Sequence, residues 1–509
     1  MLQCTTMMLF ILPFLFIGTS SALPASVVEV EVDAASVVYT MRGGIGASWH
    51  AIEKPIPGAH GGSAWGGNPP AEDEAAWQQV YRHADWLGLD WCRVELEQRM
   101  YEPQRRQFDW DNPEMGILYR ILDFCQRRKV DVFLQQMWGN VAWNTFPQWR
   151  DDPVRRVHSG PVSMADYANG LATLVEHLVK RKGYSCIRWL SIVNEPGPSW
   201  AWWQKPPNES LPLPPGLAAV RKALDDRGIA LPLSGPDWSN HPALVPEKID
   251  FDQFIGAYDI HSYFANFDGR EGGFSLSVAE QRLADWANWA HARGKPFFLS
   301  EVGTMVFGWQ GSSPGPGTYQ AALKDVELVI RGLAVGVDAF NRWSFVNRGD
   351  LDGQWQLIDT WDTHRKELLN VFTPHPNSYY LFGLVPRFTA KHSAVLKCKV
   401  AGGTAGELRH VFAAALRSPQ GNLTLLIVND AQSAWDLAID LHGLSRETRL
   451  YRYRITPAQR DRADLKIQPG KEFVLGTEAA RLLDRIPASS LSVYTTYKRG
   501  HDESGIIAE

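Results

Sequence analysis

Between residues 40 and 385 the sequence alternates short apolar runs with amphipathic helical patterns. The apolar runs are residues 43–49, 89–95, 130–136, 187–193, 229–234, 257–262, 296–300 and 337–345. Eight strands that alternate with helices over about 340 residues predict a (β/α)₈ barrel, the TIM-barrel member of the α/β class. An open, doubly wound sheet is the alternative, but no glycine-rich phosphate-binding loop opens any of the helices.

The pattern changes near residue 386. Short strand-like runs with turn signals follow, and the helical periodicity is lost, so we expect a C-terminal β-sandwich domain over residues 386–497. Residues 27–33 alternate apolar and polar side chains and could join this domain as an extra strand. The polar residues 498–509 are expected to form a disordered tail.

The chain ends and the overall charge limit where the protein acts. Residues 1–22 hold an apolar run followed by small residues, which is typical of a signal peptide, so we expect a secreted protein. A retained N-terminal anchor is the alternative, and a periplasmic or cell-surface location is also compatible with export. A net charge of −5 without a basic patch argues against nucleic acid or a membrane surface as partner. We expect a monomer. The chain has 21 tryptophans, most of which are expected to fill the core, although indole rings also stack well on flat, weakly polar ligands.

Two glutamates stand where reactive groups of a barrel belong. Glu195 follows the apolar run 187–193 within Asn-Glu-Pro, and Glu301 directly follows the run 296–300. By our count these runs are strands 4 and 7, so both carboxyl groups can face each other across the barrel mouth. Two carboxyl groups about 5 Å apart are what retaining cleavage of a glycosidic bond requires.

The pair resembles the catalytic glutamates of glycoside hydrolase clan A, in which Asn-Glu-Pro closes strand 4 and a single Glu closes strand 7. The resemblance covers residues 40–385. It implies a retaining β-glycosidase with Glu195 as acid/base and Glu301 as nucleophile. Within the clan, the trailing β-domain and the stretch from Gly44 to Trp49 are most similar to families 30, 39 and divergent family 5, and do not decide among them.

The resemblance also implies roles for residues around the pair. Arg93 would bond the nucleophile, Asn194 the sugar 2-hydroxyl, and Tyr263 would donate to Glu301. His261 would border the acid/base, and Trp343 would form the floor beneath the sugar ring.

Three more tryptophans, Trp49, Trp138 and Trp200, lie where substrate is expected and are predicted sugar contacts. Arg93 and Tyr263 are expected to lower the pKa of Glu301, while Glu195 is expected to have a raised pKa. We expect no metal and no cofactor, because no ligand-spaced cluster of His, Cys and Asp is evident.

The expected function is hydrolysis of a β-linked glucan, xylan or galactan, and three other functions are the alternatives. A transglycosidase would use the same two carboxyl groups and pass the sugar to another sugar. A catalytically silent carbohydrate-binding protein is disfavoured by the presence of both glutamates and their supporting residues. A serine hydrolase would need a Gly-x-Ser-x-Gly elbow, which the sequence lacks.

Overall fold

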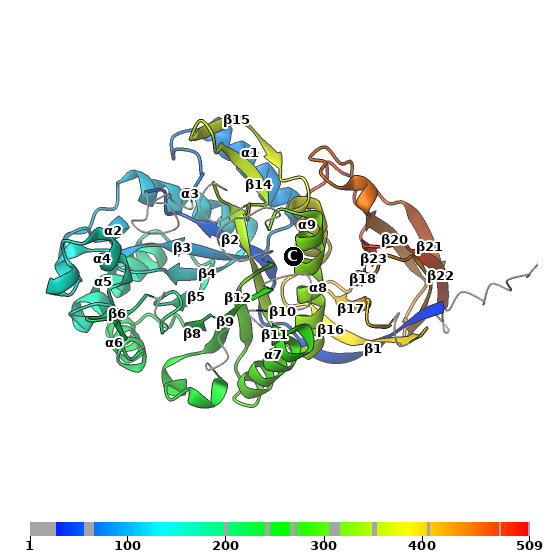
Figure 1. Cartoon of the computed structure of the whole chain (residues 1–509), viewed down its shortest axis with the longest axis horizontal. Coiled ribbons are helices and arrows are strands. Elements are labelled where there is room, and N and C mark those ends of the chain that lie inside the picture. The colour runs from blue at the N-terminus through cyan, green and yellow to red at the C-terminus, as the bar shows by residue number, and fades with distance from the viewer. Residues whose placement is uncertain are drawn as a thin grey trace, which may run out of the picture.

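The computed structural model describes residues 27–54, 66–197, 202–239, 245–264, 270–271, 274–304, 316–348, 354–404, 408–477 and 480–506. A barrel and a β-domain lie side by side, with α8 (Tyr319–Val335) and α9 (Ser378–Phe388) between them (Figure 1). The expected signal peptide, residues 1–22, lies outside the described residues. Within the described ranges, no helix has both the length and the apolar character needed to cross a membrane.

The barrel is a closed parallel sheet, which confirms the predicted TIM-barrel class. Its strands are β2 (Ile45–His50), β3 (Trp91–Leu96), β4 (Asp131–Gln136), β5 (Ile187–Ser191), β8 (Leu233–Trp238), β9 (Ala257–Phe264), β12 (Phe297–Thr304) and β13 (Ala339–Val346). Neighbours pair in this order, and β12 pairs with β13 to close the ring. A hairpin of β14 (Ile358–Asp362) and β15 (Glu367–Pro374) extends the sheet beyond β13.

The helices begin and end where local chemistry dictates. The longer ones are α1 (Glu74–Leu87), α3 (Pro113–Arg128), α5 (Met164–Glu176), α6 (Pro214–Asp225), α7 (Leu276–His291), α8 (Tyr319–Val335) and α9 (Ser378–Phe388), and the short ones are α2 (Gln98–Tyr101) and α4 (Pro153–His158). Asp73, Ser163 and Thr318 each cap a helix by accepting a hydrogen bond from a backbone N–H of its first turn.

The barrel interior is apolar near the N-terminal ends of the strands and polar near their C-terminal ends. Trp91, Phe133 and Phe298 pack together inside the ring near the strands' N-terminal ends. Beyond them along the same strands lie buried charged side chains, among them Arg93 and Glu301. Because this apolar layer fills the N-terminal end of the barrel, substrate reaches the charged groups from the C-terminal end.

The fifth barrel strand differs from its prediction. The apolar run 229–234 predicted a strand there, but β8 begins at Leu233 and continues to Trp238. The first part of the run instead forms the connection from α6. The shift places Asp237 inside the barrel wall, where it is 1% exposed.

The β-domain is a mostly antiparallel sheet of nine strands. Besides β1 (Val27–Thr40), the strands are β16 (Ala394–Gly402), β17 (Val411–Arg417), β18 (Leu423–Asn429), β19 (Trp435–His442), β20 (Thr448–Ile455), β21 (Lys471–Leu475), β22 (Ala480–Ile486) and β23 (Ser490–Thr495). Alternate residues of β18 face two cores: Leu426 packs with the barrel, and Leu425 packs within the β-domain. Four minor strands make two-residue pairs, β6 (Gln204–Lys205) with β7 (Glu209–Ser210) and β10 (Arg270–Glu271) with β11 (Phe274–Ser275).

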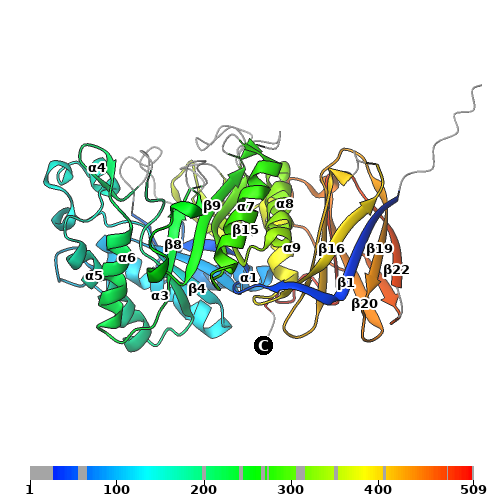
Figure 2. The ribbon, with the colours of Figure 1, turned by 90° about the horizontal axis from the view of Figure 1, so that it is seen from below.

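Strand β1 lies inside the β-domain although it precedes the barrel in the sequence. It pairs antiparallel with β16 and parallel with β19, and its valines Val28, Val30 and Val32 are buried. Figure 2 shows β1 running along the β-domain before the chain enters the barrel. The alternation seen in the sequence therefore places apolar side chains on the β-domain core.

The prediction of a disordered tail is wrong for residues 498–506. Arg499 is buried and donates through Nη1 to the carbonyl oxygens of Arg387 and Gly505. Arg387 in turn donates to the carbonyl oxygens of Gly500 and Glu503, at 2.7 and 2.8 Å. A polar segment is ordered here because its backbone supplies the acceptors that two buried guanidinium groups need.

Candidate active site

Glu195 lies in the turn that follows β5 rather than on the strand itself. Its backbone is in the left-handed region, with φ of 42°, and its N–H donates to the carbonyl oxygen of Asp237 at 3.1 Å. This conformation is unfavourable for a residue with a side chain, so the surrounding bonds must hold it. The carboxyl group is 16% exposed and can be reached from solvent.

Glu301 lies within β12, at a register shift between Leu299 and Glu301 in its pairing with β9. Irregularities of this kind redirect side chains and are common beside active sites. The side chain is 5% exposed, so Glu301 is far more enclosed than Glu195.

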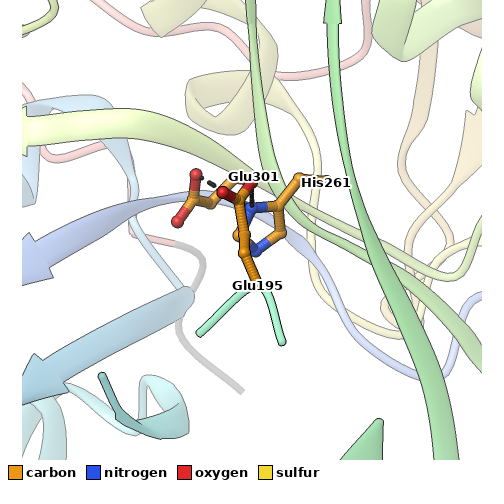
Figure 3. A group of neighbouring side chains, drawn as sticks. All are labelled: Glu195, His261 and Glu301. Carbon is orange, nitrogen blue, oxygen red and sulfur yellow. Dashed lines mark hydrogen bonds and ion pairs between the residues drawn. The ribbon is translucent and has the colours of Figure 1, made fainter. Parts of the chain in front are cut away.

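The two carboxyl groups and His261 meet at the barrel mouth (Figure 3). One oxygen of Glu195, one oxygen of Glu301 and one ring nitrogen of His261 lie within 4.8 Å of one another. His261 Nδ1 lies 2.8 Å from Oε1 of Glu195 and 3.2 Å from Oε2 of Glu301. This is the short separation that attack by one carboxylate and proton transfer by the other require.

Two donors fix the orientation of Glu301. Arg93 Nη1 bonds its Oε1 at 2.5 Å, and the hydroxyl of Tyr263 donates to its Oε2 at 2.6 Å. Arg93 also donates from Nη2 to Oδ1 of Asn194 at 2.9 Å, so one guanidinium links β12 to the turn after β5. The carboxylate is thus held in one direction with both oxygens bonded.

His261 lies among three carboxyl groups. Its Nδ1 faces Glu195 and Glu301, and its Nε2 lies 3.3 Å from Oδ1 of Asp237. Burial opposes the charged ring, but the carboxylates of Glu301 and Asp237 outweigh burial and raise the pKa of His261 well above its ordinary value. The ring is therefore an imidazolium near neutral pH, with both N–H groups directed at carboxylates.

The expected pKa direction for Glu301 is wrong. Burial raises the pKa of Glu301 above its ordinary value, although the positive charges of His261 and Arg93 oppose the rise. The repulsion from Glu195 acts in the same direction as burial. The clan A resemblance implies the bonded partners of Glu301, whereas the desolvation of its carboxyl group depends on how completely the barrel encloses it.

The three side chains at the mouth are also spaced like ligands of a metal ion. However, an imidazolium has no free lone pair to give to a metal. Both oxygens of Glu301 already accept hydrogen bonds, from Arg93 and Tyr263. The donor set therefore suits proton transfer and nucleophilic attack better than metal binding.

Trp343 lies next to this cluster, whereas the other predicted sugar contacts do not all reach it. The ring of Trp343 has the guanidinium of Arg93 6.0 Å from its centroid and the edge of His50 at 4.5 Å. Trp138 is only 2% exposed and stacks on Trp202 at 4.1 Å, so its face is covered by protein. Trp200 lies outside the described residues.

The prediction of a sugar contact for Trp49 is wrong. Its ring is fully buried and packs against Trp77, Phe124 and Phe345. Successive side chains of a strand point to opposite faces, and the next residue, His50, takes the inward position beside Glu95. Trp49 therefore belongs to the layer between the barrel and its helices.

Asp237 is the site residue that the sequence did not reveal. Besides His261, it has Arg93 Nη2 at 3.7 Å and accepts hydrogen bonds from Ser300 and Gln135, each at 3.2 Å. Although burial opposes it, the charges of His261 and Arg93 hold the pKa of Asp237 below its ordinary value. Asp237 thus keeps a permanent negative charge behind both cationic groups of the site.

The raised pKa of His261 predicts a pH dependence of stability. A group with a raised folded-state pKa stabilises fully below its unfolded value, about 6.5 for histidine, and this stabilisation is lost as pH rises through the folded value. We expect the free energy of unfolding of the wild type to decline from about pH 7 into the alkaline range, and His261→Gln to lack this slope. Urea unfolding at several pH values measures it. The exposed His364→Gln is the control, and equal slopes in wild type and His261→Gln would contradict the charge state assigned to His261.

A closed (β/α)₈ barrel with two carboxyl groups converging at its mouth is an arrangement suited to glycoside hydrolysis. The family model of cellulase, glycosyl hydrolase family 5, matches residues 49–324, more than half of the chain. The chain therefore belongs to glycosyl hydrolase family 5, within clan A, and is a glycosidase. No curated protein matches it.

Solved structures share the fold at low sequence identity. A family 30 subfamily 8 xylanase from Clostridium acetobutylicum is 14% identical, with a TM-score of 0.57 over 92% of this chain and 99% of its own. A family 30 endoxylanase from Clostridium papyrosolvens is 12% identical, with a TM-score of 0.58 over the same shares. A bacterial orthologue of human α-L-iduronidase is 15% identical, with a TM-score of 0.59 over 92% of this chain and 84% of its own.

Proposed function

We propose that this glycosidase cleaves β-linked poly- or oligosaccharides with retention of the anomeric configuration. The observation that carries the proposal is the close approach of Glu195 and Glu301, whose nearest oxygens lie within 4.8 Å. An inverting enzyme needs room for a water molecule between its carboxyl groups and spaces them about 6.5–9.5 Å apart.

In the first step, Glu301 attacks the anomeric carbon while the proton of Glu195 passes to the departing glycosidic oxygen. The bond between carbon and leaving oxygen breaks, and a glycosyl ester with Glu301 forms. Arg93 and Tyr263 hold the attacking carboxylate in line. The greater exposure of Glu195 suits a group that must reach the leaving sugar and then solvent water.

In the second step, Glu195 is a carboxylate and takes a proton from water as the water oxygen attacks the anomeric carbon. The ester bond breaks, Glu301 is regenerated as a carboxylate, and the sugar leaves with its original configuration. His261 Nδ1 lies within reach of both carboxyl groups, so it can donate to whichever of them is charged in each step. Asp237, on the other side of the ring, accepts from Nε2 of His261 and holds the imidazolium in place beside Glu195.

Glucan and xylan are the substrates that we propose first. The family model takes its name from cellulase, and two of the similar structures are xylanases, which supports β-linked polysaccharides of plant type. Galactan stays within the same proposal because it is also a polymer of β-linked pyranosides.

The test is hydrolysis by the full chain of β-glucan, β-xylan, β-galactan and aryl β-glycosides, followed by NMR of the first product. We expect release of the β-anomer before mutarotation. Release of the α-anomer would contradict retention, and transfer of the sugar to an added acceptor without net hydrolysis would assign a transglycosidase instead.

We also propose that the protein is exported and acts as a monomer. The apolar run and the small residues within residues 1–22 support export. Expression of the chain with and without residues 1–22, followed by assay of the medium and sizing of the product, tests both statements. Retention of the full chain in the cell would contradict export.

A further inference from the structure

A cavity of about 740 Å³ lies apart from the catalytic pair, between the β14–β15 hairpin, the N-terminal ends of α8 and α9, and the β-domain. None of the described residues that line it belongs to the active site. Its lining is mixed, with indole, amide, hydroxyl and carboxylate groups, which include Trp361, Gln354, Gln356, Asp359 and Thr373. This size is typical of a small-ligand site, and the polar lining does not suit a lipid or another wholly apolar ligand.

A buried amide in the lining lacks part of its hydrogen bonding. Gln356 is 6% exposed and donates from Nε2 to Oδ1 of Asp359 at 2.9 Å. Among the described residues, its Oε1 has no hydrogen-bond partner. A buried acceptor left unpaired is costly, so it indicates that a donor on a ligand or a bound water completes it.

Trp361 supplies an aromatic surface to the same cavity. The indole of Trp361 is among the lining groups, and the guanidinium of Arg348 lies 4.1 Å from the centroid of its ring. An indole and an amide acceptor in one cavity match the C–H face and the hydroxyl groups of a pyranose.

The cavity and the catalytic centre lie on opposite sides of one extended segment. Gln354 and Gln356 line the cavity, whereas Trp355 between them is fully buried on the other side. Its ring lies 5.5 Å from the ring of Tyr263, which donates to Glu301. A ligand in the cavity would therefore be close to the catalytic centre without contacting it.

The β-domain contributes to this cavity. Arg460 and Asp461, in the connection between β20 and β21, line it. Asp461 is fixed to the barrel by two hydrogen bonds of 2.9 Å with the side chain of Asn377. The carboxylates of Asp362 and Asp461 lie beside Arg365 and Arg460, at 2.7 and 3.6 Å, which leaves no unbalanced positive charge for an anion.

We propose that this cavity is a second carbohydrate-binding site, which holds a neutral sugar unit of the polysaccharide against Trp361 and Gln356. The proposal rests on the proposed function and gives the β-domain a part in holding substrate. The site would bind a distant part of the chain that is being cleaved, or another chain, and thereby keep the enzyme on its substrate.

Affinity electrophoresis in gels that contain soluble β-glucan or β-xylan tests the site. The Glu301→Gln variant is used throughout, so that the polysaccharide is not cleaved. We expect adding Trp361→Ala to weaken retardation about tenfold in affinity. Gln356→Met keeps the side-chain volume but removes the amide oxygen that would accept a hydrogen bond from a sugar hydroxyl, so it should weaken retardation as well. Trp435→Ala, at a partly exposed position of β19, is the matched control and should migrate like Glu301→Gln alone.

Kinetics separate this proposal from the proposed function. In the otherwise wild-type enzyme, Trp361→Ala should raise KM for polysaccharide and leave kcat/KM for aryl β-glycosides unchanged. Equal retardation of Glu301→Gln with and without Trp361→Ala, or no retardation in either gel, would overturn the second site. Inactivity of the wild type on every glycoside would instead overturn the proposed function.

Discussion

Glu301→Gln should lower kcat/KM by about 10⁴-fold or more on every substrate, because the amide cannot form the glycosyl ester. The fold should be kept. The amide oxygen can accept from Arg93 as the carboxylate does, and the amide nitrogen can donate to the hydroxyl of Tyr263. Burial raises the pKa of Glu301, which means that the folded state disfavours its charge, so replacing the carboxylate with a neutral amide should not lower the stability of the fold. Steady-state assays and thermal unfolding measure the two effects.

The control for this prediction is Glu367→Gln, at an exposed position of β15. It makes the same chemical change without touching the site and should leave activity unaltered. Activity of Glu301→Gln near the wild-type level would remove Glu301 from the role of nucleophile. A large loss of stability would make the kinetic loss uninformative, and Glu301→Ser would then be compared.

Glu195→Gln should lower activity in a way that depends on the leaving group. For unactivated sugar leaving groups, we expect a loss of about 10²–10⁴-fold, because the departing oxygen must be protonated. A dinitrophenolate needs no proton, so formation of the glycosyl ester on Glu301 should stay fast. Hydrolysis of that ester then lacks its base, and we expect a burst of dinitrophenolate followed by slow turnover.

Azide distinguishes this role further. It is a nucleophile that needs no general base, so it should restore turnover of Glu195→Gln and yield a β-glycosyl azide. Glu209→Gln, an exposed glutamate of β7, is the matched control and should show neither burst nor rescue. Equal losses on activated and unactivated substrates would show that Glu195 is not the proton donor.

The barrel could be predicted from the sequence because its strands are apolar runs separated by helical patterns. The first and last residues of each strand were harder to predict. The run 229–234 ends in Ser234, and the following Gly235-Pro236 has the composition of a turn. The structure continues β8 through these residues to Trp238. Asp237 was missed for this reason, because a residue assigned to a loop gives no sign that it lies in the barrel wall.

Side-chain direction was the second limit. A parallel barrel buries both faces of its strands, so an apolar run does not show which residues point inward. Trp49 was assigned to the site for this reason, whereas its neighbour His50 points inward. Glu195 and Glu301 escaped the ambiguity because they stand at the ends of such runs, where a carboxyl group has no role in apolar packing.

Electrostatics was the third limit. The clan A resemblance implies that Arg93 and Tyr263 are neighbours of Glu301 and that His261 is a neighbour of Glu195, and the structure brings them to these carboxyl groups. The sign of the pKa shift depends on desolvation, however, and that is a property of the completed barrel. The same holds for the C-terminal segment, whose order depends on its own buried Arg499 and on Arg387, which is buried elsewhere in the fold.

The position of β1 constrains how the protein can be made. Synthesis produces β1 before any barrel strand, yet its partners β16 and β19 begin only at Ala394 and Trp435. During most of translation the valine face of β1 is therefore without its native cover. Pairing across so long a stretch of chain is slow to form, and an uncovered strand edge readily pairs with other chains. The barrel strands are complete before the last quarter of the sequence, which holds the partners of β1, has been made. Interrupted synthesis would therefore leave a closed barrel joined to an open, aggregation-prone strand.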